Sequence, residues 1–94
     1  MARLDEAAIR KAVLELPEWT LDGMAIRRQF TLPSFPDAIA FVTRLAFDAE
    51  AADHHPDILI NYKRVTLTYS THSEGGLTQK DFDGARKADA LTRV

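Results

Sequence analysis

The chain has 94 residues, of which 46% are hydrophobic and 28% charged, and its formal net charge is −2. These values are typical of one soluble globular domain spanning residues 1–94. The chain has no cysteine, which excludes disulfides and cysteine-based metal sites. It has no basic cluster, so no nucleic-acid surface is predicted. It also has no apolar run of about 20 residues, so no membrane span is predicted.

The first predicted element is an amphipathic helix over residues 5–16. Apolar side chains recur along it at helical spacing until Pro17 ends the pattern. The charged residues 1–11 lack the apolar core of a signal peptide, so we expect a cytoplasmic protein.

A β-hairpin is predicted over residues 19–31. The dipeptide Asp22-Gly23 suits the positive φ angles of a two-residue turn. Successive side chains of a strand point to opposite faces, so alternate residues of the second strand are expected to share one face. These residues are Met24, Ile26, Arg28 and Phe30.

A long helix is predicted to begin at Ser34, which forms a capping-box pattern with Asp37. Most of its apolar side chains cover one broad face, but Phe47 lies on another flank. Pro56 disfavours helix at the residue before it, so the helix is predicted to end within residues 53–55.

Two further strands are predicted, over residues 57–61 and 63–71. After a loop over residues 73–76, a last helix begins at Thr78, which forms a second capping-box pattern with Asp81. The longer strand alternates strictly, with Val65, Leu67 and Tyr69 on one face and Thr66, Thr68, Ser70 and, by parity, His72 on the other.

The predicted element order is α-β-β-α-β-β-α. Two hairpins joined by a helix indicate an antiparallel sheet whose apolar face must be covered by helices. We therefore predict a two-layer α+β fold, with a four-stranded antiparallel sheet and three helices packed on one face.

All three histidines of the chain lie at the ends of two predicted elements. Glu50 and His54 are four residues apart, so one helical turn would bring the carboxylate beside the imidazole and orient its tautomer. His54 and His55 lie where the helix breaks, so their rings are predicted to point in different directions. Because His72 follows the longest strand, it can meet Asp53 and the other two histidines at one rim of the sheet.

Several other interpretations of these residues stay open. A histidine pair near an acid can be a solvated helix C-cap, because a cation there suits the helix dipole. Glu50, His54 and His72 have ligand chemistry suited to zinc or iron, although no fuller metal motif surrounds them. Two serines flank His72 without a recognisable nucleophile elbow. Gly75 and Gly76 can border a phosphate, but they also simply permit a turn before a capped helix.

The histidines belong to a longer pattern. The stretch "EAADHHP" from Glu50 to Pro56 is followed by Tyr62, by His72 in "STH" and by Asp81 in "GLTQKD". In residue types and spacing this pattern resembles the pterin-4a-carbinolamine dehydratase family. Upstream, "RRQFTLPSFPDAIAF" is also similar to the family, so the resemblance covers nearly the whole chain. A motif of this length is specific, which favours a functional site over a solvated helix cap.

The resemblance implies a lyase that removes water from a 4a-hydroxytetrahydropterin to give the quinonoid dihydropterin, without a metal or cofactor. The hydroxyl group needs a proton to leave and N5 must lose one, and histidine titrates near neutrality. His54 and His72 are the implied acid and base, while His55 holds the pterin and shares in proton transfer. The residues implied in substrate binding are Glu50, Asp53, Pro56 and Asp81, although a capping carboxylate equally explains the last of these.

The same resemblance implies partners. They are a small pterin substrate, other copies of the chain in a dimer or tetramer, and functionally an aromatic amino acid hydroxylase whose pterin is recycled. Phe47 lies off the core face and the sheet face with Thr66 and Thr68 is uncovered, which agrees with self-association. Two alternative roles stay open: a dimerisation cofactor of a transcription regulator, and a pterin protein serving molybdenum-cofactor metabolism. No nucleic-acid or membrane partner is expected.

Overall fold

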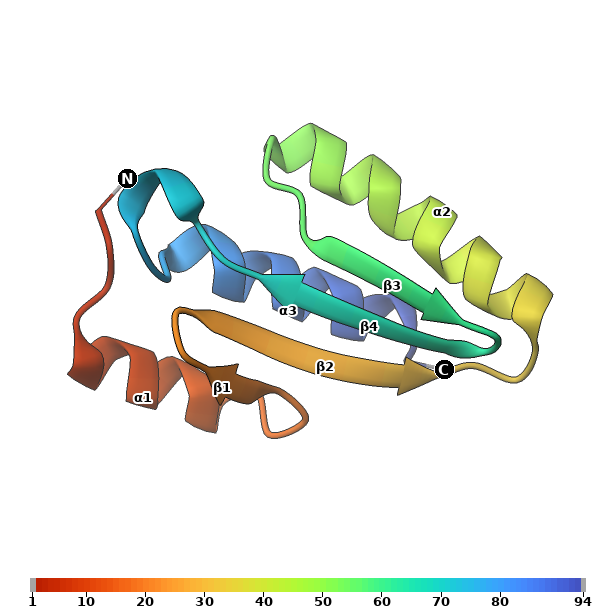
Figure 1. The fold of residues 1–94 in the computed structure, drawn as a ribbon, viewed down its shortest axis with the longest axis horizontal. Helices are drawn as coiled ribbons and strands as arrows, with labels where there is room; N and C mark the ends of the chain where they lie inside the picture. Colours follow the sequence, from red (N-terminus) through yellow and green to blue (C-terminus); the bar gives the residue numbers. More distant parts are fainter. Residues whose placement is uncertain (1, 94) are drawn as a thin grey trace.

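The computed structural model describes residues 2–93 and confirms the predicted element order (Figure 1). The elements are α1 (Glu6–Leu14), β1 (Thr20–Asp22), β2 (Ala25–Thr31), α2 (Phe35–Ala52), β3 (Asp57–Asn61), β4 (Arg64–Tyr69), the short 3₁₀ helix η1 (His72–Glu74) and α3 (Gln79–Leu91). Among the described residues, none of the helices combines the length and the apolarity that a membrane crossing requires.

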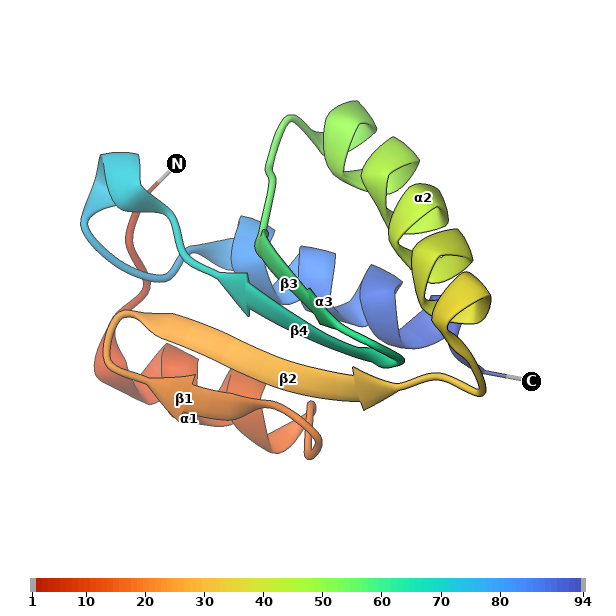
Figure 2. The same cartoon turned by 45° about the vertical axis from the view of Figure 1, so that its right-hand side comes forward.

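The four strands form one antiparallel sheet in the order β1-β2-β4-β3. The alternation predicted for β4 is confirmed, because Val65, Leu67 and Tyr69 are buried while the residues between them are only half-buried. These side chains pack with the apolar faces of the helices, and residues of α1 pack against the same core. Figures 1 and 2 show α3 running behind the sheet, which leaves the other face without a helix. The predicted two-layer α+β fold is thus confirmed.

The turn between β1 and β2 differs from the prediction. Asp22 pairs with Ala25, so the two turn residues are Gly23 and Met24 rather than Asp22 and Gly23. Gly23 has a φ of 60°, and a glycine at the first central position is the requirement of a type II′ turn. Met24 therefore lies at the hairpin tip with 65% of its surface exposed, not on the apolar face of β2.

Both ends of α2 follow from local sequence. The Ser34 hydroxyl oxygen accepts a hydrogen bond from the Asp37 amide at 3.2 Å, as the capping pattern predicts. The helix ends at Ala52 because Asp53 takes a left-handed conformation, with φ 51° and ψ 42°. In that conformation the Asp53 amide satisfies carbonyl oxygens of the last turn, and the chain leaves the helix axis before His54.

Candidate functional site

The adjacent residues His54 and His55, which follow α2, lie on opposite faces of the sheet. His54 turns toward the helix layer, where its ring stacks on the buried ring of Tyr69. His55 borders a cavity on the helix-free face, together with Thr68 of β4. The prediction that the two rings point in different directions is confirmed, and the physical cause is the left-handed Asp53 that turns the chain out of α2.

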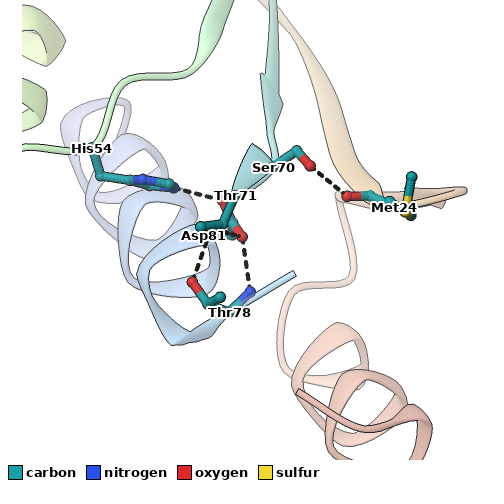
Figure 3. Close-up of polar contacts among 6 residues, drawn as sticks. All are labelled: Met24, His54, Ser70, Thr71, Thr78 and Asp81. Atoms are coloured by element: carbon teal, nitrogen blue, oxygen red, sulfur yellow. Dashed lines mark hydrogen bonds and ion pairs between the residues drawn. The ribbon is translucent and has the colours of Figure 1, made fainter. Parts of the chain in front are cut away.

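His54 is held by a carboxylate from a distant helix. Its Nε2 atom lies 2.6 Å from Oδ1 of Asp81 at the start of α3. Figure 3 draws this contact as a dashed line. The Asp81 side chain has no exposed surface and the His54 side chain is 12% exposed. Because a carboxylate only accepts hydrogen bonds, His54 must carry a proton on Nε2, which leaves Nδ1 as the acceptor in the neutral ring.

The other carboxylate oxygen of Asp81 also accepts hydrogen bonds. Oδ2 accepts a hydrogen bond from the Thr78 amide at 2.9 Å and another from the Thr71 hydroxyl at 2.8 Å. The predicted capping role is therefore confirmed, and the same carboxylate also fixes His54. A buried carboxylate with three donors has its hydrogen bonds well satisfied, and this network connects the end of β4, the start of α3 and the loop that carries His54.

His55 and His72 line one cavity of about 260 Å³. His72 begins η1, after Ser70 and Thr71, which follow β4, and it lies on the helix-free side of the sheet, as strand alternation predicts. The Ser70 hydroxyl donates to the Met24 carbonyl oxygen at 2.7 Å and ties the end of β4 to the hairpin tip (Figure 3). The complete lining consists of Met24, Ala25, His55, Asp57, Thr68, Ser70 and His72.

The prediction that Glu50 lies beside His54 is wrong. Helical spacing does not continue past Ala52, so Glu50 contacts His55 instead, with 2.8 Å between Oε1 and Nε2. This pair is open to solvent, because the His55 side chain is 55% exposed and that of Glu50 is 82% exposed. It orients His55 near the cavity but contributes little to stability.

The structure separates the remaining predicted residues. Asp53 is exposed at the helix end, whereas Pro56 is buried directly before β3. Within residues 2–93, no group of three or more histidine, aspartate or glutamate side chains is placed to hold a metal ion. In particular, Glu50, His54 and His72, the residues of the metal interpretation, do not converge.

Sequence reasoning missed the groups that surround His54 and Asp81 on the helix side of the sheet. Thr71, between Ser70 and His72, is 9% exposed and points to Asp81, and Tyr69 lies against His54. The alternation of β4 already indicates that both side chains face the helix layer, but it does not show which distant residues they meet there.

Known proteins resemble this chain over nearly its whole length. A family model described as "Pterin 4 alpha carbinolamine dehydratase" matches residues 2–91. A protein of Roseiflexus sp. (strain RS-1) is 55% identical over 89 residues, which cover 95% of this chain and 96% of that protein. One of Chloroflexus aurantiacus is 53% identical over 91 residues, which cover 97% and 98%. Both carry the name "Putative pterin-4-alpha-carbinolamine dehydratase".

Two solved structures share the fold. The crystal structure of a transcriptional coactivator/pterin dehydratase from Brucella melitensis has a TM-score of 0.92 and 40% identity, covering 97% of this chain and 99% of that one. A pterin dehydratase-like RuBisCO assembly factor of the alpha-carboxysome has a TM-score of 0.65 and 23% identity over 78% and 84% of the two chains, which is a likeness of fold alone. The family model and the two bacterial relatives span nearly all of the chain, and it therefore belongs to the pterin 4 alpha carbinolamine dehydratase family.

Proposed function

We propose that this protein converts a 4a-hydroxytetrahydropterin into the quinonoid dihydropterin and water. The observation that carries the proposal is the cavity on the helix-free face, where His55 and His72 come together from separate segments of the chain. Its volume of about 260 Å³ is close to the roughly 300 Å³ at which small-molecule pockets begin, so it suits one bicyclic ring.

The reaction needs two proton transfers. The C4a hydroxyl group leaves as water after it gains a proton, and the lone pair of N5 forms the C=N bond as N5 loses its proton. Imidazole is suited to both transfers because it gains and loses a proton near neutral pH. A well-placed general acid or base typically contributes about 10²–10⁴ in rate.

We assign the roles from the family resemblance and the observed placement together. His72 borders the cavity and carries out one of the two transfers. The second transfer is assigned to His54 from the resemblance alone, because His54 does not line this cavity. His55, which does line it, holds the pterin ring. Asp81 positions His54 and touches no substrate, because its carboxylate has no exposed surface. Glu50 and Asp53 are left to bind the amide and amino edge of the pterin.

The decisive experiment follows the dehydration of freshly generated 4a-hydroxytetrahydropterin by the wild-type protein and by His54→Ala, His55→Ala and His72→Ala. A direct proton donor or acceptor loses about 10²-fold or more in kcat when it is replaced, whereas a group that only binds the ring raises KM. Lys11→Ala, an exposed substitution on α1, is the control. If all three histidine variants fold and keep wild-type turnover, the proposal fails.

We further propose that the protein works as a homo-oligomer that recycles the pterin of an aromatic amino acid hydroxylase. Two exposed apolar side chains support self-association, Phe47 on α2 with 75% of its surface exposed and Leu59 on the edge strand β3 with 63%. Apolar groups of this size on a helix flank and a sheet edge favour contact with a second copy. Sedimentation that shows a monomer at micromolar concentration would contradict the oligomer.

A further inference from the structure

Tyr69 is the last residue of β4 and one of the most buried side chains of the protein, with 1% of its surface exposed. The centroid of its ring lies 6.0 Å from that of His54, and the two ring planes are inclined by only 21°. On another side the ring meets Trp19, at 5.9 Å between centroids. The His54 imidazole therefore has Asp81 at its Nε2 edge and the Tyr69 ring against its plane.

The position of the Tyr69 ring depends on Gly84 of α3. A Cβ atom at this position would lie 2.6 Å from Cε1 and 2.8 Å from Cζ of Tyr69, which is far inside van der Waals contact. The backbone of α3 thus approaches the ring as closely as it does because residue 84 has no side chain. The ring is confined between this helix and His54, and a bulkier residue at 84 would displace it.

We propose that Tyr69, seated on Gly84, is a positioning residue that fixes the plane of the His54 imidazole and keeps its Nε2 directed at Asp81. In its effect on turnover this inference rests on the proposed function, because it assumes that the orientation of His54 matters for the reaction. The effect of Tyr69 on the orientation of the His54 ring does not depend on any enzymatic activity.

The ring acts by contact and not by proton transfer. Burial, followed by the carboxylates of Asp48 and Asp81, raises the pKa of the Tyr69 phenol to about 12, so it stays protonated at neutral pH. A cavity of about 280 Å³ adjoins both rings and is lined by Leu45 and Ala49 of α2 among others. Removal of the aromatic ring would extend this cavity under His54 and leave the imidazole free to tilt.

Four variants test the inference: Tyr69→Phe, Tyr69→Met, Gly84→Ala and the double variant Tyr69→Met/Gly84→Ala. The first readout is the NMR spectrum of the His54 ring and its pH dependence, which needs no activity. The second is kcat and KM for carbinolamine dehydration. Tyr69→Phe keeps the ring and should retain the wild-type spectrum, titration and kcat.

Loss or displacement of the ring should change both readouts. Tyr69→Met fills the volume without a flat surface, and we expect altered His54 resonances and a kcat reduced roughly tenfold to a hundredfold at nearly constant KM, as a misplaced catalytic group would give. Gly84→Ala should act in the same direction. Added to Tyr69→Met it should have no further effect, because the ring it displaces is already gone.

Val65→Ala separates positioning from general destabilisation, since Val65 is a fully buried residue on the same face of β4. It should lower stability and leave the His54 spectrum unchanged. An unchanged His54 spectrum and titration in Tyr69→Met, or an equal change in Val65→Ala, would overturn the positioning role. If the wild-type protein has no dehydratase activity while Tyr69→Met still alters His54, the proposed function fails and the positioning role stands.

Discussion

The Nε2 atom of His54 lies 2.6 Å from Oδ1 of Asp81, although 27 residues separate them in sequence. Through this contact the first turn of α3 holds the loop that follows α2, and the capping carboxylate of one helix orients a histidine at the end of another. The stability of the fold and the geometry of the candidate site are therefore coupled at a single side chain.

The substitution Asp81→Asn should lower both the stability of the fold and the activity of the candidate site. An asparagine side chain offers one oxygen and one NH₂ group, so it cannot accept from both His54 Nε2 and the Thr78 amide, and one of these donors is left facing the NH₂ group in the interior. A buried donor without a partner costs about 1–3 kcal/mol, and we expect a loss of this size in the free energy of unfolding measured with urea. The dehydratase kcat should also fall. Asp83→Asn, at an exposed position of the same helix, is the matched control and should change neither value.

Glu50→Gln should separate substrate binding from stability. The pair that Glu50 forms with His55 is largely exposed, so the free energy of unfolding should change by less than about 1 kcal/mol. If the Glu50 carboxylate binds the amide and amino edge of the pterin, KM should rise while the melting temperature stays constant. An unchanged KM would remove Glu50 from the proposed substrate-binding residues.

Asp53 allows the backbone and the carboxylate to be tested independently. It occupies a left-handed conformation, with φ 51°, that glycine adopts without strain. We expect Asp53→Gly to raise the free energy of unfolding by roughly 0.5–1 kcal/mol and Asp53→Ala to lower it by about 1 kcal/mol. Both variants lack the carboxylate, so a role in substrate binding requires the same increase of KM in each. If KM rises only in the less stable Asp53→Ala variant, the carboxylate has no role in substrate binding.

Tyr69 should make the protein sensitive to alkali. Its pKa is raised from 10.0 to about 12, so below pH 10 the folded and unfolded states are both protonated and stability does not depend on this group. As the pH rises from about 10 to 12, the unfolded state loses its proton first, and the free energy of unfolding should fall by up to about 2 kcal/mol.

Urea titrations at a series of alkaline pH values measure this fall. Tyr69→Phe should flatten the decline, since phenylalanine has no proton to lose. Tyr62→Phe, at a tyrosine with 67% of its surface exposed, should keep the wild-type pH dependence. A Tyr69→Phe protein with an unaltered decline would show that another group is responsible.

Much of the fold could be predicted because the decisive signals are local. Alternation along β4 and the caps at Ser34 and Thr78 each involve residues a few positions apart, and the structure confirms them. The break before Pro56 is also observed, although α2 ends at Ala52, one residue before the predicted range. The failures are also local. Glycine fits the first position of a type II′ turn, so the hairpin turns at Gly23 and Met24, one residue later than the Asp-Gly pattern predicts.

The sequence by itself determined the element order, the two-layer arrangement, the different directions of His54 and His55 and the resemblance to a pterin dehydratase family. Periodicity, caps and motif spacing are properties of neighbouring positions, and they can be read without coordinates. Only the tertiary structure decided that Asp81 rather than Glu50 holds His54, that Tyr69 supports the ring and that His55 shares a cavity with His72. Those contacts depend on how separate elements pack, and packing distances between distant segments are not encoded in any local pattern.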